Sequence, residues 1–244
     1  MKVPKSHPRY LSLITRDRIV KGVEKGVTSI HGLIAQGRGE AFDYLIGERT
    51  NEYAKKAIDA AACLLLTSKH PVISVNGNVC ALAAKEIVKL SKVIPAKMEI
   101  NIFHSSPKRE KLIAKELRKA GAKEVLLPSK KFNIKHIDHN RKYVNKNGIL
   151  IADVVLVPLE DGDRCQALIK NGKKVIAIDL NPKSRTSQKA TITIVDNITR
   201  AIRLLIDEIG QMKKKDVAYL RKQIKNYNNQ KILKEAIASI KTNF

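Results

Sequence analysis

Six short runs rich in valine, isoleucine and leucine recur through the middle of the chain. They occupy residues 71–75, 99–103, 124–127, 153–157, 175–179 and 191–195. Helical spacing of apolar residues fills most of the intervals, at 79–93, 107–120, 162–170 and 197–208. Strands this apolar are typical of a parallel sheet whose crossover helices cover both faces. The sequence therefore predicts an α/β core with a mostly parallel sheet and helices on both faces.

The segments on either side of this core are expected to be helical. Helical spacing predicts helices at 9–26, 40–47 and 51–68. A glycine-rich break is expected between the first two, from Gly32 to Gly39. The chain then divides into an N-terminal helical region (1–68), the α/β core (69–210) and a tail of one or two solvated helices (211–244). We expect these three parts to pack as one integrated domain.

The chain carries 47 lysine and arginine residues against 23 acidic ones, a formal charge of +24 over 244 residues. This excess suggests a polyanionic partner such as nucleic acid, although charged surfaces also occur in thermophile proteins and aid solubility. Segments 108–147 (net +9) and 200–244 (net +7) hold most of it. Residues 128–147 also interrupt the strand–helix pattern, and we expect a mobile insertion or surface loop there.

Several classes of protein are excluded by composition. An apolar fraction of 43% is too high for intrinsic disorder. No apolar run reaches the roughly 18–20 residues of a membrane span, and the start lacks an apolar stretch of signal-peptide length, so we expect a soluble intracellular protein. Three widely spaced cysteines form no zinc or disulfide pattern. His136 and His139 have a metal-compatible spacing but no third ligand nearby, so no metal site is predicted.

Ligands of open α/β sheets bind beyond the carboxyl ends of the strands, which selects four loops. They are 76–78 (Asn-Gly-Asn), 104–106 (His-Ser-Ser), 179–188 and 196–200. Asn76 and Asn78 can hydrogen-bond a ligand or cap an ordinary strand-to-helix turn. His104 can bind a phosphate or carboxylate, or move a proton. No GxxxxGK[ST], GxGxxG or GxSxG motif accompanies these loops.

The loop at 179–188 carries the strongest signal for a nucleotide. Asp179 stands at a strand tip, where a carboxylate can contact a ribose hydroxyl or a base amine. The cations and hydroxyls that follow, at Lys183, Arg185 and Thr186, suit phosphate oxygens. In the last loop, Asp196 or Asn197 is expected to cap the following helix, which does not prevent a role in binding.

Arginines in the N-terminal region suggest a further phosphate contact. Arg38 lies between Gly37 and Gly39, so a flexible backbone can present its guanidinium to an anion. Arg16 and Arg18 lie on the first predicted helix. Either of them is expected to face inward only if it meets an anionic partner.

Four motifs together resemble a known family of enzymes. They are SHPRYLSL at 6–13, GLIAQGRGEAFDYLIGE at 32–48, SVNGN at 74–78 and IDLNPKSRTS at 178–187. The sequence resembles the archaeal 4-phosphopantoate–β-alanine ligases, also called phosphopantothenate synthetases. The resemblance runs over residues 1–210, and the lysine-rich tail carries little of it.

The resemblance implies a reaction. ATP, 4-phosphopantoate and β-alanine give AMP, pyrophosphate and 4′-phosphopantothenate through an acyl-adenylate, on the route to coenzyme A. It also implies a Rossmann-like core, a cytoplasmic homodimer and Mg²⁺ that accompanies ATP without a dedicated protein site.

The resemblance also assigns residues to the substrates. It places ATP on Arg16, Arg38, Asp179, Leu180, Asn181, Arg185, Thr186, Asn197 and Ile198. We expect Arg38 and Arg185 to contact phosphate oxygens, and Asp179 with Asn181 to contact the nucleoside. We expect Asn76, Asn78 and His104 on the phosphopantoate side. Among these residues, Arg38, Asn76 and His104 are the candidates for catalysis.

Two other functions compete with this one. The +24 charge favours a nucleic-acid-binding protein, but only ten aromatic residues are present and none clusters with basic residues as a stacking platform. The predicted sheet is compatible with a dinucleotide-dependent dehydrogenase, but the missing GxGxxG motif argues against it.

Overall fold

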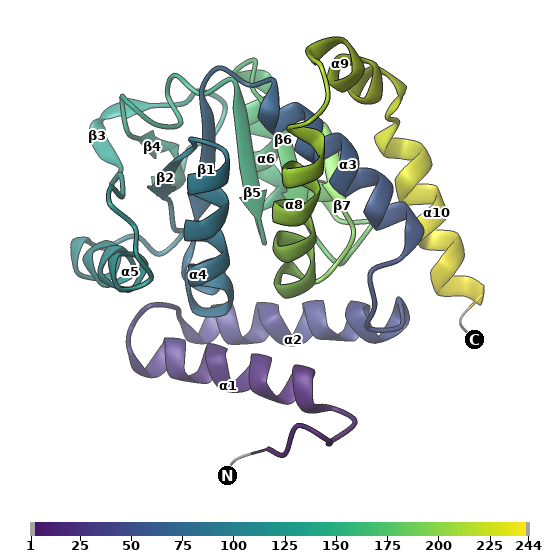
Figure 1. Cartoon of the computed structure of the whole chain (residues 1–244). Coiled ribbons are helices and arrows are strands. Elements are labelled where there is room, and N and C mark those ends of the chain that lie inside the picture. The colour runs from purple at the N-terminus through teal and green to yellow at the C-terminus, as the bar shows by residue number, and fades with distance from the viewer. Residues whose placement is uncertain (1–2, 243–244) are drawn as a thin grey trace.

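The computed structural model describes residues 3–242 (Figure 1). Three helices open the chain: α1 (Tyr10–Glu24), α2 (Ile30–Leu45) and α3 (Glu52–Leu66). The first half of the core contains β1 (Pro71–Val75), α4 (Gly77–Val93), β2 (Lys97–Ile100) and α5 (Pro107–Lys119). The second half contains β5 (Val154–Pro158), α6 (Gly162–Lys170), β6 (Lys174–Ile178), α7 (Arg185–Lys189), β7 (Ile192–Ile194) and α8 (Ile198–Met212). Helices α9 (Val217–Asn226) and α10 (Asn229–Thr242) follow.

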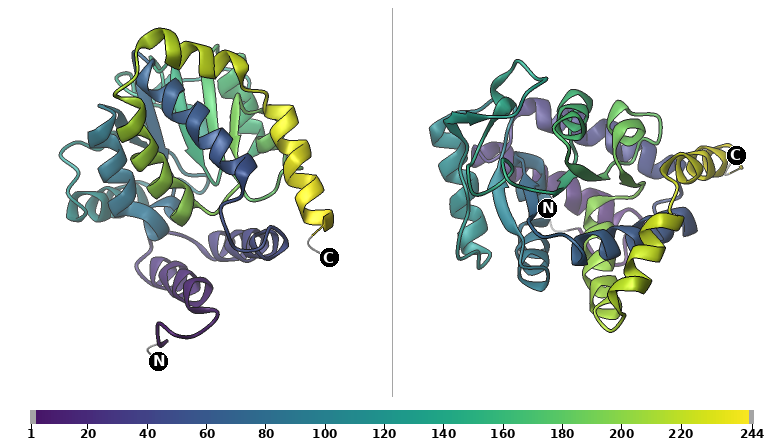
Figure 2. Two further views of the ribbon diagram at one scale, coloured as in Figure 1. Left: turned by 45° about the vertical axis from the view of Figure 1, so that its right-hand side comes forward. Right: turned by 90° about the horizontal axis from the view of Figure 1, so that it is seen from above.

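The five core strands form a parallel sheet in the order β2-β1-β5-β6-β7. Alternate strand residues point to opposite faces, so Val155 and Val175 pack with α6 while Leu156 and Ile176 pack with the helices of the other face. Helices α3, α4 and α8 lie on that second face, and α6 lies behind the sheet (Figures 1 and 2). The predicted fold class is confirmed, because every strand pair in the sheet is parallel and both faces are covered.

The glycine-rich break predicted at 32–39 is wrong, because α2 runs through it. Ser29 caps this helix by accepting a hydrogen bond from the Gly32 backbone N–H. A Cβ atom on Gly32 would lie 2.3 Å from both Thr28 Oγ1 and Asn78 Oδ1. Glycine is therefore required there for close packing of α2 against the start of α4, and the helix accepts its lower intrinsic propensity.

The strand predicted at 124–127 is also wrong. Leu126 makes only an isolated parallel bridge to Glu99 of β2, with hydrogen bonds from Leu126 N to Met98 O and from Ile100 N to Leu126 O. Pro128 follows and has no backbone N–H with which to extend the pairing. The sheet therefore ends at β2 on this side.

Residues 128–147 are folded, so the mobile insertion or surface loop expected there is not found. They form an antiparallel hairpin of β3 (Ser129–Asn133) and β4 (Tyr143–Val144), with a 3₁₀ turn η1 (Asn140–Lys142) between the strands. Ile134, Ile137 and Val144 are buried in the same apolar cluster as α6. Because these three apolar side chains recur among many lysines, the segment reads as solvated in sequence although one side of it is buried.

The C-terminal helices complete the core and cover the edge strand β7. Leu220 of α9 and Leu233 of α10 are buried in the same cluster as Ile19 of α1. Asn229 Oδ1 accepts a hydrogen bond from Thr193 N at 2.8 Å, and its amide donates to Ser187 O at 2.9 Å. This contact pairs a strand edge that would otherwise be open. Within residues 3–242, no helix combines the length and apolar character needed to cross a membrane.

Candidate active site

A cleft of about 610 Å³ lies between α2 and the loops that follow the sheet strands. Helix α2 passes across the carboxyl ends of the strands (Figure 1). The chain adds β2 on one side of β1 and β5 on the other, so a topological switch point lies between β1 and β5. Ligands of open α/β sheets bind at such a point. Loops after all five strands contribute to the cleft lining, as the sequence predicted for four of them.

Asn76 joins the two strands at the switch point. Its Oδ1 accepts from Val79 N at 3.0 Å, which caps α4. Its Nδ2 donates to Pro158 O at 3.2 Å and to Leu159 O at 2.9 Å, beyond the end of β5. Both amide hydrogens are therefore used within the protein, and Asn76 sets the shape of the cleft floor. Its predicted catalytic role stays a prediction.

The loop after β6 forms one end of the cleft, which we call the β6 end, and Asp179 organises it. Asp179 accepts hydrogen bonds from the Ser184 hydroxyl and from Asn181 N. Burial raises the pKa of Asp179, while these hydrogen bonds and the charge of Arg38 oppose the shift. Asn181 Oδ1 in turn accepts from Lys183 N at 2.9 Å. The loop is thus held by its own side chains before any ligand arrives.

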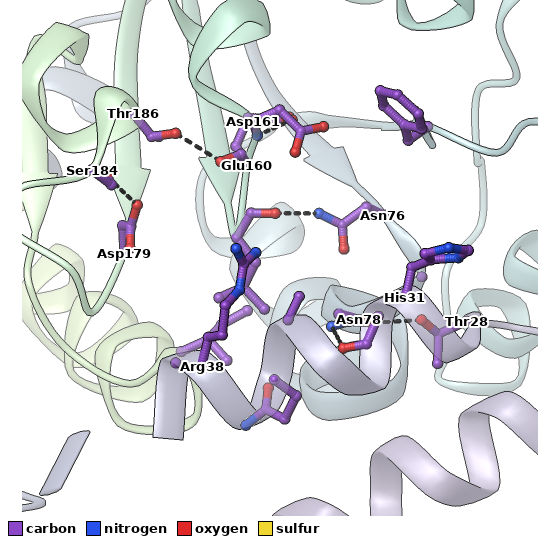
Figure 3. Close-up of a pocket in the computed structure, with 18 of the residues that line it drawn as sticks. Thr28, His31, Arg38, Asn76, Asn78, Glu160, Asp161, Asp179, Ser184 and Thr186 are labelled. Atoms are coloured by element: carbon purple, nitrogen blue, oxygen red, sulfur yellow. Dashed lines mark hydrogen bonds between the residues drawn. The ribbon is translucent and has the colours of Figure 1, made fainter. Parts of the chain in front are cut away.

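Arg38 and Arg185 extend into the same part of the cleft from two different helices. Arg38 rises from α2 between Asp179 and Asn76 (Figure 3). Arg185 starts α7 and donates to Gln166 at 2.5 Å, and a Cβ atom on Gly162 would lie 2.5 Å from its Cβ. Neither arginine forms an ion pair with a carboxylate in residues 3–242. They are therefore available to an anionic ligand.

The remaining residues predicted at this end form its wall. Asn197 caps α8 by accepting from Thr199 N, and its amide donates to Asp43 of α2 at 2.8 Å. Thr186 donates its hydroxyl to Glu160 O at 2.7 Å. Leu180 and Ile198 are buried apolar residues of the lining. The predicted cap at the start of α8 is confirmed, with Asn197 as the capping residue.

Arg16 is the one predicted ATP residue that does not line this cleft. It lines an adjacent groove between α1 and α2, where Nε and Nη2 both donate to the carboxylate of Glu40. Burial opposes ionisation of Glu40, but hydrogen bonds from Arg16 and Tyr44 outweigh it and lower the pKa of the carboxyl. Arg16 is exposed, with 44% of its side-chain surface accessible, so it faces the groove rather than the core and is paired there with Glu40.

The opposite end of the cleft, which we call the β2 end, is formed by the loop after β2 and the start of α2. His31 and His104 lie there with ring centroids 4.8 Å apart. Asn78, by contrast, is engaged within the protein: the Thr28 hydroxyl donates to its Oδ1, and its Nδ2 donates to Gly32 O at 2.8 Å. The three residues predicted on the phosphopantoate side therefore differ: Asn76 and Asn78 are hydrogen-bonded within the protein, whereas the His104 side chain has no hydrogen-bond partner among the described residues.

Glu160 holds Arg141, which lines the cleft floor, and Arg164, which is fully buried. Its carboxylate accepts from Arg141 Nη2 at 2.9 Å and from Arg164 Nη1. Arg141 also reaches Asp161 at 2.6 Å and Asn101 Oδ1 at 2.9 Å. These contacts connect the β3–β4 hairpin to the ends of β2 and β5. The hairpin is thus part of the site.

Sequence reasoning missed His31, Arg109, Arg141, Glu160 and Asp161 among the lining residues. A signal was available for Glu160 and Asp161, because they lie within four residues of the end of the strand predicted at 153–157, in the same position as the other selected loops. Arg109 follows His104 by five residues but resembles the surrounding lysines. Arg141 carried no local signal, since its neighbours are typical of a solvated surface.

The described residues 3–242 contain no group of three or more histidine, cysteine, aspartate or glutamate side chains that could hold a metal ion. His139, one of the two histidines with metal-compatible spacing, instead lies 2.7 Å from Asp163. Of the cleft carboxylates, Glu160 and Asp161 are engaged by Arg141, and Asp179 is engaged by Ser184 and Asn181. These residues do not fit a resident metal ion.

Known proteins are similar to this sequence over nearly its whole length. The family described as "Phosphopantothenate/pantothenate synthetase" matches residues 53–243. A 4-phosphopantoate–β-alanine ligase of Methanosarcina mazei is 51% identical over 238 residues, covering 98% of this chain and 94% of the relative. Ligases of the same name from Thermococcus kodakarensis and Thermococcus onnurineus are 50% and 51% identical, each covering 99% of this chain and 93% of the relative.

The similarity continues beyond residue 210, so the tail belongs to the shared region, contrary to the extent inferred from the motifs. The resemblance itself is confirmed by identity of about one half over nearly the whole chain. The chain belongs to the phosphopantothenate/pantothenate synthetase family.

Proposed function

We propose that this protein is a 4-phosphopantoate–β-alanine ligase of coenzyme A biosynthesis. It condenses 4-phosphopantoate with β-alanine to 4′-phosphopantothenate and converts ATP to AMP and pyrophosphate. The observation that carries the proposal is the placement of Arg38 and Arg185, two arginines without carboxylate partners in the described residues, at the carboxyl edge of the sheet. The names of the full-length relatives supply the substrates.

The reaction proceeds in two steps. An oxygen of the pantoate carboxylate attacks the α-phosphorus, and the bond from this phosphorus to pyrophosphate breaks, giving the acyl-adenylate. The amine nitrogen of β-alanine then attacks the acyl carbon, the bond to the AMP oxygen breaks, and the amine releases its proton.

The first step must bring a carboxylate to a triphosphate that repels it. Arg38 from α2 and Arg185 from α7 reach the cleft from different elements, so together they can hold phosphate oxygens and reduce the repulsion. The two arginines are positioned by separate helices before the ligand binds, so their electrostatic contribution requires little rearrangement at the moment of reaction.

The nucleoside is proposed to lie on the β6 end, where Asp179, Asn181 and Asn197 line the wall with Leu180 and Ile198. Asp179 and Asn181 contact the ribose or base in this proposal. Arg16, paired with Glu40 in the neighbouring groove, can reach ATP only if this ion pair opens or if the residue serves the cleft of a partner subunit.

Mg²⁺ is proposed to arrive with the phosphates of ATP, and no step is assigned to a metal held by the protein, since the cleft residues do not fit one. The protein is proposed to act as a homodimer in the cytoplasm. Light scattering at micromolar concentration tests the dimer, and a monomeric mass there contradicts it.

AMP release tests the reaction directly. Purified protein is incubated with ATP and Mg²⁺, and either 4-phosphopantoate or β-alanine is omitted in turn. Sustained AMP release is expected only when both are present. Exchange of labelled pyrophosphate into ATP is expected with 4-phosphopantoate alone, because an acyl-adenylate forms reversibly before the amine enters. No AMP release, together with tight, salt-sensitive RNA or DNA binding, favours the nucleic-acid alternative.

A further inference from the structure

The amide-forming step of the proposed reaction requires a group that takes a proton from the amine. An alkyl ammonium titrates near the pKa of lysine, about 10, so nearly all of it is protonated at neutral pH. A protonated nitrogen has no lone pair and cannot attack the acyl carbon. One proton must therefore leave before the attack and another after the new bond has formed. A side chain that receives the first proton needs a free acceptor atom in the cleft.

Three carboxylates line the cleft among the described residues, and two of them are fully engaged. Glu160 is buried, and its carboxylate holds two arginines. Asp179 accepts hydrogen bonds with both of its oxygens from the loop that follows it. The third carboxylate is that of Asp161, and 49% of its side-chain surface is exposed. Asp161 is thus the cleft carboxylate that a ligand can reach.

Asp161 has one oxygen held by the protein and one oxygen free. Its Oδ2 accepts from Arg141 Nη1 at 2.6 Å, which fixes the orientation of the carboxylate. Its Oδ1 has no hydrogen-bond partner among residues 3–242. An aspartate at a helix N-cap usually accepts from the first turn, but Asp161 stands at the N-cap of α6 without doing so. The side chain lines the cleft instead of capping its helix.

The backbone around Asp161 packs against the start of α7, which carries a proposed phosphate ligand. Thr186 donates its hydroxyl to Glu160 O at 2.7 Å. A Cβ atom on Gly162 would lie 2.5 Å from Arg185 Cβ, so glycine permits this close approach. Asp161 is the residue between these two contacts. Its carboxylate therefore lies in the same part of the cleft as Arg185, which is proposed to hold phosphate oxygens.

The order of the strands places Asp161 between the nucleotide and the acid. Strand β5 lies between β6, whose loop is proposed to bind the nucleoside, and β1 at the switch point. Asp161 and Arg38 reach the region of Asn76 from opposite sides, from the loop after β5 and from α2 (Figure 3). An acid joined to the α-phosphorus extends away from the nucleoside and across the end of β5. Its acyl carbon thus passes the Asp161 carboxylate.

We propose that Asp161 is the proton acceptor of the amide-forming step and that its Oδ1 receives the β-alanine ammonium. The inference rests on the proposed function and deepens it, because the reaction by itself names no base. One N–H bond of the ammonium breaks, its proton passes to Oδ1, and the electron pair stays on nitrogen. The nitrogen attacks the acyl carbon, the bond from this carbon to the AMP oxygen breaks with its electron pair leaving on AMP, and the second proton passes to solvent. Because Asp161 is half-exposed, it returns its own proton to water.

Two histidines also line the cleft and can accept a proton. His31 and His104 lie at the β2 end, and β2 is two positions from β5, which corresponds to roughly 10 Å at the spacing of neighbouring strands. A carboxylate attracts an ammonium group by its charge, whereas a neutral imidazole does not. Position and charge therefore both favour Asp161 over the histidines.

Asp161→Asn tests the proposal, with Asp163→Asn as the matched control. Asp163 is 40% exposed and lies 2.7 Å from His139 of the hairpin segment, but it does not line the cleft. Both substitutions thus remove a carboxylate charge that contacts this segment. For Asp161→Asn we expect AMP release that depends on β-alanine to fall by about 100-fold or more. Asp163→Asn should stay within about threefold of the wild type.

Two partial reactions separate a lost base from structural damage. Exchange of labelled pyrophosphate into ATP with 4-phosphopantoate needs no amine, so in Asp161→Asn it should stay within about threefold of the wild type. Hydroxylamine is largely unprotonated at neutral pH and attacks the acyl-adenylate without a base, so hydroxamate formation should also stay within about threefold. A purely structural role for Asp161 lowers all three rates together. Asp161→Glu keeps a carboxylate in the cleft and should recover part of the activity with β-alanine.

Three results overturn the inference. One is turnover of β-alanine in Asp161→Asn that equals turnover in Asp163→Asn. Another is a loss in Asp161→Asn that is equally large in pyrophosphate exchange. The third is a selective loss with β-alanine in His104→Gln while Asp161→Asn remains active, which assigns the proton to the histidine. Failure of the proposed function looks different, because the wild type itself then exchanges no pyrophosphate and releases no AMP.

Discussion

Arg141, at the cleft floor, and the fully buried Arg164 form a floor pair with the Glu160 carboxylate between them. Arg38, Arg109 and Arg185 line the cleft with no carboxylate ion pair in residues 3–242. The side chains of the floor pair are 4% and 0% exposed. A buried guanidinium needs an internal anion, because water does not compensate its charge. An arginine left unpaired in a cleft can meet its anion in a ligand. The comparison thus separates arginines that hold the site together from arginines available to substrates.

Glu160→Gln is expected to have the largest effect on stability. Arg164 already has buried Nε and Nη2 atoms without a hydrogen-bond partner among the described residues, so it depends on Glu160 for charge compensation. Removing one partner of a buried ion pair costs about 3–5 kcal/mol in the free energy of unfolding. Chemical denaturation measures this loss. Asp161→Asn, which removes the half-exposed partner of Arg141, is the control and should cost about 1 kcal/mol or less. Equal, small losses in both variants contradict the structural role of Glu160.

Glu99, in β2, gives the stability of the protein a pH dependence. Its buried carboxylate accepts from Asn145 N at 3.0 Å and Ile149 N at 2.6 Å, and burial raises its pKa from 4.5 to about 7. A raised folded-state pKa gives stability that is full below pH 4.5 and lost as the pH rises through 7. The free energy of unfolding should therefore fall by about 3 kcal/mol over this range from this group alone.

Glu99→Gln removes this titration. The unfolding free energy of the wild type minus that of the variant should fall by about 3 kcal/mol between pH 4.5 and 8, because only the wild type loses this group's contribution. If the unfolding free energies of wild type and variant change in parallel with pH, the Glu99 carboxyl does not titrate between pH 4.5 and 8.

Arg38→Ala tests an arginine that lines the cleft without a carboxylate ion pair among residues 3–242. We expect a loss of at least about 2 kcal/mol in kcat/KM, because the guanidinium is proposed to hold phosphate oxygens near the reacting centre. Thermal unfolding should remain near that of the wild type, since Arg38 is exposed and lacks an ion pair among the described residues. Wild-type kinetics in this variant remove Arg38 from the site. A large drop in the unfolding temperature instead indicates that Arg38 stabilises the fold, as Arg141 and Arg164 do.

The surface lysines should matter least. Lys130→Gln with Lys131→Gln removes two exposed charges of the β3–β4 hairpin. The surplus charge is expected only to steer anionic substrates, so kcat/KM should fall by about twofold or less at low salt and not at all at high salt. A tenfold loss assigns these lysines a direct contact with substrate.

The sequence predicts those site residues that lie in loops at the carboxyl ends of strands. Asp179, Arg185 and Asn197 were found because they follow apolar runs, and all three line the cleft. Glu160 obeyed the same rule and was overlooked. His31 could not be found this way, because its place beside His104 depends on how α2 crosses the sheet.

Sequence by itself determined the parallel α/β architecture, the loops at the strand ends and the family, because periodicity and motifs are local properties that persist in any packing. Only the tertiary structure decided which cations are neutralised. Arg16 meets Glu40 across two helices, Arg141 meets Glu160 from a hairpin that reads as solvated, and Arg109 meets no carboxylate among residues 3–242. The physical reason is that the state of a charge depends on its neighbours in space, and residues far apart in the chain supply them.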